Sequence, residues 1–172
     1  MTAKLNEQVE VEFYSSNFYL QMSSWCAFNS LEHCANFLRK HSQEEMGHMF
    51  RLFDYINETG ALAVIPSIDK PPTEFDNLRE LFEAIYAHEQ FVTKKINELA
   101  EVAFTEKDFS TFSFLQWYVA EQHEEERLFK GILDRIDIIG LEGRGLYHID
   151  MEIGNIDAGE KQISNPFLDD KA

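Results

Sequence analysis

Four glutamates interrupt four apolar stripes in this sequence, each where a core side chain is expected. Steps of three and four residues keep side chains on one helix face, and each stripe read in this way has an acidic residue near its middle. A carboxylate in an apolar interior costs several kcal/mol unless it is paired or protonated, so something must compensate it. The four residues are Glu12, Glu45, Glu89 and Glu125.

The interruptions are clearest in the third and fourth stripes. Glu89 is the one polar residue of the third, and Gln122 and Glu125 stand together in the fourth. The four stripes are Leu5, Val9, Glu12, Ser16, Tyr19, Ser23 and Cys26; Cys34, Leu38, His41, Glu45, His48, Leu52 and Tyr55; Leu78, Phe82, Ile85, Glu89, Val92, Ile96, Leu99 and Ala103; and Leu115, Tyr118, Gln122, Glu125, Phe129, Ile132, Ile136 and Ile139. Their interruptions fall at similar heights, so we expect the carboxylates to meet.

Metal ions are the compensation that these residues favour. None of the four stripes contains a Lys or Arg, so an internal salt bridge is excluded, whereas two divalent cations would neutralise four carboxylates. Carboxylate oxygen with imidazole nitrogen suits Fe, Mn or Zn better than Cu(I), and the thiolates of structural zinc are missing. Glu45 and His48 lie one helical turn apart on one face, which makes Glu45 the natural bridge. The sequence predicts a dinuclear metal site.

Several roles are open for the residues beside this site. Tyr19 follows Glu12 on the same stripe, where it could hydrogen-bond a ligand, give an electron to an intermediate, or be an ordinary core tyrosine. His41 is predicted to be a core or boundary residue rather than a ligand. A second acidic group flanks the stripes and is either a solvated face or a weaker further metal site. It comprises Glu44, Glu121, Glu124 and Glu126.

Long helices are expected to position these residues, because the chain has only four prolines, at positions 66, 71, 72 and 166. We predict helices over about 3–28, 30–60, 77–104, 108–140 and 145–157. The expected turn and cap residues are Asn29 and Ser30, Gly60, Asn77 with Glu80, Asp108 and Gly140. Residues 1–158 thus form one bundle domain, and 159–172 are predicted to be a flexible tail.

The segment at about 61–76 decides the topology. The second helix is about 43 Å long, and some sixteen extended residues reach about 50 Å, so the segment can cross the whole bundle. A hairpin would need only about 2 to 8 residues. We therefore expect the second and third helices to be parallel, in an all-α four-helix bundle with one long crossover and a short fifth helix.

Composition limits the partners. The 172 residues include 31 Asp and Glu against 15 Lys and Arg, a net charge of −16 that repels nucleic acid and anionic membranes and attracts cations. No apolar run is long enough to span a membrane, and the first residues lack a signal-peptide pattern. Cys26 and Cys34 are expected to be free thiols in a reducing cytoplasm.

Four motifs resemble those of the bacterial non-haem ferritins, over about residues 4 to 157. They are E-x-Y-S-S-x-x-Y at 12–19, Q-E-E-M-x-H-M at 43–49, H-E-Q at 88–90 and F-L-Q-W-Y-V-x-E-Q-H-E-E-E at 114–126. The resemblance implies a ferritin-like bundle that self-assembles into a hollow shell of twenty-four subunits, with the fifth helix at the fourfold axes. It also implies that iron is oxidised by O₂ or H₂O₂ and stored as a ferric oxo-hydroxide mineral.

The same resemblance implies a role for each site residue. The first iron is held by Glu12, Glu45 and His48, and the second by Glu45, Glu89 and Glu125 with Gln122 close by. A third iron site is implied at Glu44, Glu121, Glu124 and Glu125, and Tyr19 matches the tyrosine beside the centre. Gln122 and Glu125 replace the second Glu-x-x-His motif of bacterioferritin and rubrerythrin, which argues against both. No haem is expected, because methionine at helical spacing is usually a core residue.

Two other functions remain open at this level. One is a di-iron or di-manganese peroxidase or catalase that consumes peroxide without storing metal. The other is a non-catalytic helical assembly protein whose buried glutamates are protonated or bind structural metal. A mineral core and a large shell would exclude the first, and rapid oxygen consumption would exclude the second.

Overall fold

The computed structural model describes residues 1–160, with side chains described up to residue 156. Residues 159 and 160 of the predicted tail belong to the last helix, and the rest of that tail lies outside the described residues. Five helices and no strands make up the described part of the chain. They are α1 (Thr2–Phe28), α2 (Glu32–Glu58), α3 (Leu78–Thr105), α4 (Phe109–Ile139) and α5 (Gly145–Glu160).

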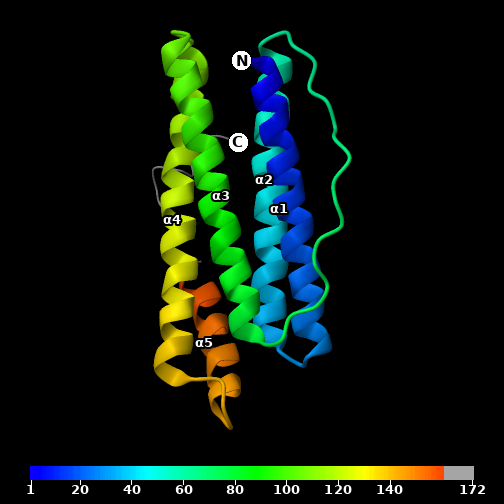
Figure 1. Ribbon diagram of the computed structural model, residues 1–172, viewed down its shortest axis with the longest axis vertical. Helices are drawn as coiled ribbons and strands as arrows, with labels where there is room; N and C mark the ends of the chain where they lie inside the picture. The colour runs from blue at the N-terminus through cyan, green and yellow to red at the C-terminus, as the bar shows by residue number, and fades with distance from the viewer. Residues whose placement is uncertain (161–172) are drawn as a thin grey trace.

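The four long helices form two antiparallel hairpins joined by a crossover. α1 packs along α2, α3 packs along α4, and α1 contacts α3. Figure 1 shows the segment after α2 running down the outside of α1 for the length of the bundle, so that α3 begins at the opposite end and runs parallel to α2. The predicted all-α bundle with a long crossover and a short fifth helix is confirmed. None of the described helices is long and apolar enough to cross a membrane.

Local sequence explains most helix ends. Asn77 accepts a hydrogen bond from the Glu80 N–H at 3.0 Å and caps α3, while Asp108 accepts one from Thr111 N–H at 3.1 Å and caps α4. Gly60 and Gly140 follow α2 and α4 with φ of 82° and 75°, a left-handed region that glycine occupies without strain.

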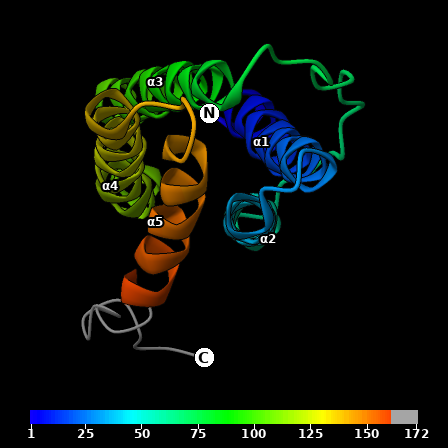
Figure 2. The same cartoon turned by 90° about the horizontal axis from the view of Figure 1, so that it is seen from below.

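The start of α2 differs from the expected one. Ser30 lies in the turn with φ of 61°, and Leu31 is the N-cap without a side-chain cap bond. The Asp150 carboxylate of α5 replaces that cap, because it accepts hydrogen bonds from Cys34 N–H at 2.9 Å and His33 N–H at 3.4 Å. The predicted turn at Asn29 and Ser30 is present, but the prediction that this pair supplies the N-cap of the second helix was wrong. Figure 2 shows α5 leaving the base of the bundle between α4 and α2.

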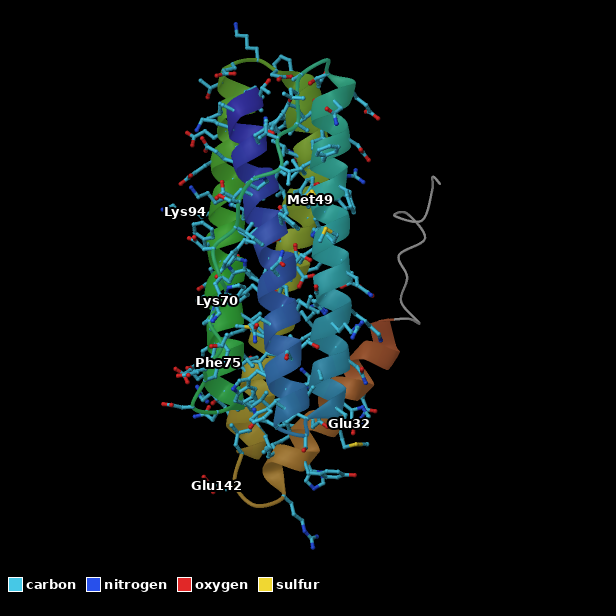
Figure 3. The ribbon with its side chains drawn as sticks, turned by 90° about the vertical axis from the view of Figure 1, so that its right-hand side faces the viewer. Glu32, Met49, Lys70, Phe75, Lys94 and Glu142 are labelled. Carbon is cyan, nitrogen blue, oxygen red and sulfur yellow. The ribbon has the colours of Figure 1, made fainter. Side chains whose placement is uncertain are left out.

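The apolar core is divided into two clusters with a polar layer between them. The lower cluster includes Met22, Phe82 and Phe129, and the upper cluster includes Leu52 and Leu115. In Figure 3, Met49 of the upper cluster lies in the upper half of the bundle and Phe75, packed against the lower cluster, lies near its base. The residues between the clusters are the ones that interrupt the apolar stripes.

Candidate metal centre

A layer of buried carboxylates crosses the bundle between the two apolar clusters. We call it the carboxylate layer; its members come from all four long helices and are 0 to 8% exposed. They are Glu12 on α1, Glu45 and His48 on α2, Glu89 on α3, and Gln122 and Glu125 on α4. All six predicted positions are therefore brought to one level. Two predicted stripe residues outside this layer are less buried than expected, namely Tyr55 and Ile139.

Three members of the layer form a compact group of possible metal ligands. One ligand atom each from Glu12, Glu45 and His48 lies within 4.8 Å of the other two. Nδ1 of His48 is 3.1 Å from Oε2 of Glu45, as one helical turn between them requires. Gln8, one turn before Glu12, donates a hydrogen bond from Nε2 to Oε1 of Glu12 at 2.9 Å. A neutral amide therefore orients the α1 carboxylate.

Glu89 has a donor for each carboxylate oxygen. The hydroxyl of Tyr19 on α1 donates to Oε1, and Nε2 of Gln122 on α4 donates to Oε2 at 2.9 Å. Tyr19 itself is fully buried, so its hydroxyl has no contact with bulk water. The two donors hold the carboxylate between α1 and α4, close enough to Glu12 for the charge of Glu12 to raise its pKa.

Glu125 has an incomplete hydrogen-bonding shell. Its Oε2 is buried and has no hydrogen-bond partner, which normally costs a folded protein free energy. Nε2 of His41 lies 3.8 Å from this oxygen, too far for a hydrogen bond, while Nδ1 of His41 lies 3.1 Å from the Phe37 carbonyl oxygen. An oxygen in this state is a suitable acceptor for a cation.

Burial shifts the acids of the layer towards their neutral forms. Burial, reinforced by Glu45, raises the pKa of Glu12 to about 8. Burial also raises the pKa of Glu89 to about 7, although the Tyr19 hydrogen bond opposes the shift. For Glu45 and Glu125, burial and the charge of Glu89 raise the pKa well above its usual value. Among the described residues, no buried Lys or Arg supplies a counter-charge.

Three residues of the second acidic group, Glu44, Glu121 and Glu124, lie beside the layer and are more open. Glu44 and Glu124 are exposed, and Glu121 is half-buried. Burial raises the pKa of Glu121, and the charges of Glu124 and Glu44 raise it further. Within the described residues, these three side chains do not form a group of ligand atoms as compact as that of Glu12, Glu45 and His48.

We did not predict Gln8 as part of the site, and we did not predict that His41 approaches Glu125. Gln8 precedes Glu12 by four residues, a spacing that puts both on one helix face and could have identified it. His41 is buried, as predicted, but it also faces Glu125 across the bundle, and no spacing within α2 reveals that contact.

A four-helix bundle whose interior carries a layer of carboxylates and a histidine defines the class of helical-bundle metal-binding proteins. Residues 2–139 match the family model described as the ferritin-like domain. The chain belongs to the ferritin family, which stores iron.

Several relatives are similar over nearly the whole chain. The bacterial non-heme ferritin of Escherichia coli O6:H1 is 54% identical over 157 residues, 91% of this chain and 95% of that protein. That of Campylobacter jejuni is 50% identical over 158 residues, 92% of this chain and 95% of that protein. A solved open-pore ferritin from Archaeoglobus fulgidus matches with a TM-score of 0.86 and 40% identity, covering 89% of this chain and 93% of the other.

Proposed function

We propose that the carboxylate layer is a dinuclear ferroxidase centre, at which two Fe(II) ions are bound and oxidised before storage. Glu12, Glu45 and His48 hold the first iron. Glu45, Glu89 and Glu125 hold the second, with Glu45 bridging and Gln122 beside it. The observation that carries the proposal is a set of four buried acids with no buried Lys or Arg among the described residues to neutralise them.

Iron binding and proton release are coupled in this proposal. Acids with raised pKa values hold protons in the empty centre, and iron displaces these protons because a ligand carboxylate must be ionised. The two Fe(II) ions then lose one electron each. Dioxygen takes both electrons with two protons and leaves as hydrogen peroxide, or peroxide takes them and leaves as two water molecules. Paired ions thus avoid the release of superoxide.

The remaining predicted residues have roles around this step. Tyr19 holds Glu89 through its hydroxyl. In this proposal it also gives an electron to an intermediate. Glu44, Glu121 and Glu124, with Glu125, bind a third iron more weakly, since the first three are more exposed than the carboxylate layer. Fe(III) then hydrolyses and moves to a mineral inside a self-assembled shell of twenty-four subunits. The acidic charge of the chain favours Fe(II) uptake and mineral nucleation.

Stopped-flow absorbance with simultaneous oxygen measurement tests the proposal. Apoprotein given two Fe(II) per subunit should oxidise both rapidly and then saturate, while Glu45→Ala should lose the rapid phase because both metal positions share Glu45. Circular dichroism of the variant controls for folding. Oxidation by the wild type no faster than in buffer would leave a passive metal-binding protein instead.

A further inference from the structure

Two grooves on the bundle surface approach the carboxylate layer, and each is lined by a glutamine that bonds to one of its acids. The α1–α3 groove includes Gln8, which donates to Glu12. The α3–α4 groove includes Gln122, which donates to Glu89. The layer is almost completely buried, so an ion that enters by either groove passes one of these two glutamines.

We propose that the α3–α4 groove is the route by which a hydrated divalent cation reaches the carboxylate layer, with Gln122 as the last side chain it passes. This inference rests on the proposed function, because it assigns a path to the same metal centre. The walls of the α3–α4 groove are formed by Thr93 and Asn97 from α3 and by His123 and Glu126 from α4.

The sizes of the two grooves favour this assignment. The α3–α4 groove has a volume of about 240 Å³, whereas the α1–α3 groove has a volume of about 90 Å³. The α3–α4 groove therefore leaves more room for the water that a divalent ion carries.

The difference in charge between the two grooves also favours the α3–α4 groove as the route. In the α1–α3 groove, Lys4 and Lys95 balance Glu7 and Glu98. In the α3–α4 groove, the carboxylate of Glu126 has no Lys or Arg among the lining side chains. A cation is therefore attracted along the groove toward Glu89.

The wall of the α3–α4 groove offers donors and acceptors that suit the water shell of an ion. Thr93 contributes a hydroxyl oxygen that is buried and has no hydrogen-bond partner in the structure. Asn97 and Glu126 add oxygen acceptors, and oxygen is the ligand atom that hard divalent ions prefer. The amide of Gln122 closes the inner end, so its hydrogen bond to Oε2 of Glu89 must open when the ion enters.

Binding of Co(II) to the apoprotein tests the route without iron oxidation. Thr93→Leu narrows the α3–α4 groove, and Val11→Leu narrows the α1–α3 groove as a control. By stopped-flow absorbance of bound Co(II), we expect Thr93→Leu to slow association and dissociation together by about tenfold, with Kd and stoichiometry unchanged. A residue on a path alters the barrier and leaves both end states as they were.

A second pair of variants tests whether the charge of Glu126 attracts the ion into the α3–α4 groove. Glu126→Gln should slow association severalfold and weaken its dependence on salt, whereas the same change at Glu98 in the other groove should not. Unchanged rates in Thr93→Leu, or slower binding in Val11→Leu alone, would overturn the route. A wild-type protein that binds no Co(II) would instead refute the dinuclear centre itself, so the two failures are distinguishable.

Discussion

The Tyr19 hydroxyl on α1 donates a hydrogen bond to Oε1 of Glu89 on α3, and so joins the two helical hairpins within the carboxylate layer. Gln122 donates to the other oxygen of the same carboxylate. Glu89 is therefore the acid of the layer whose charged form receives two side-chain donors. Burial raises its pKa to about 7, and the tyrosine hydrogen bond limits that rise.

Removing that hydroxyl should make the second metal position more sensitive to pH. In Tyr19→Phe the pKa of Glu89 should rise further, so protons should compete with the second Co(II) ion at higher pH than in the wild type. A rise of about one unit would weaken binding about fivefold at pH 7, because the ionised fraction of Glu89 would fall from about one half to about one tenth. Tyr118→Phe is the matched control, because the Tyr118 hydroxyl donates to the His48 backbone carbonyl. Equal pH profiles for the two variants would contradict this role of Tyr19.

Glu89→Gln should abolish tight binding at the second metal position and leave the first position intact. The substitution keeps the shape of the side chain and removes a charge proposed to hold only the second iron. We expect Co(II) titration to give one tightly bound ion per subunit instead of two, and rapid Fe(II) oxidation to fall by a factor of about 10² or more. Glu44→Gln, outside the layer, should still bind two ions. Two tight ions in Glu89→Gln would exclude Glu89 as a ligand.

The apoprotein should lose stability as the pH rises. The folded-state pKa values of Glu12 and Glu89 are about 8 and 7, above the ordinary glutamate value of 4.5. Between about pH 4.5 and 8 the folded protein therefore holds more protons than the unfolded chain, and the stabilisation present at low pH is lost. Thermal unfolding should show the apoprotein Tm falling by several degrees over this range, by about 2 to 4 °C per kcal/mol.

Bound metal should remove most of that dependence, since an ion replaces the protons as the counter-charge. Zn(II) serves as a redox-inert test ion, and Glu45→Ala with Zn(II) controls for ions bound elsewhere. A Tm of the apoprotein that rises from pH 5 to 8 would contradict the raised pKa values of these acids.

The sequence was sufficient for the bundle and its carboxylate layer because both depend on periodicity. An acid such as Glu89, placed in an otherwise unbroken apolar stripe, can be recognised from the sequence alone. Contacts between helices cannot be predicted from periodicity in the same way, because the register of one helix against another depends on how their whole surfaces pack. The Tyr19 bond to Glu89 was therefore only one of several roles open to that tyrosine, and the approach of His41 to Glu125 was not foreseen.

The cap that Asp150 provides to α2 is a further contact of this kind, and it should hold α5 against the bundle. In Asp150→Ala the N–H groups of His33 and Cys34 would lose their acceptor at a helix start that has no other side-chain cap. The loss should cost about 0.5 to 2 kcal/mol, the usual range for a cap, and should affect α5 and the first turn of α2 most.

Hydrogen exchange measured by mass spectrometry checks this directly. Peptides covering the start of α2 and the whole of α5 should exchange faster in Asp150→Ala, while those covering the carboxylate layer on α3 should not change. Glu152→Ala is the matched control, because Glu152 is an exposed acid on the same helix. Equal exchange in both variants would mean that the buried apolar residues of α5, Ile149 and Ile153, are sufficient to dock it.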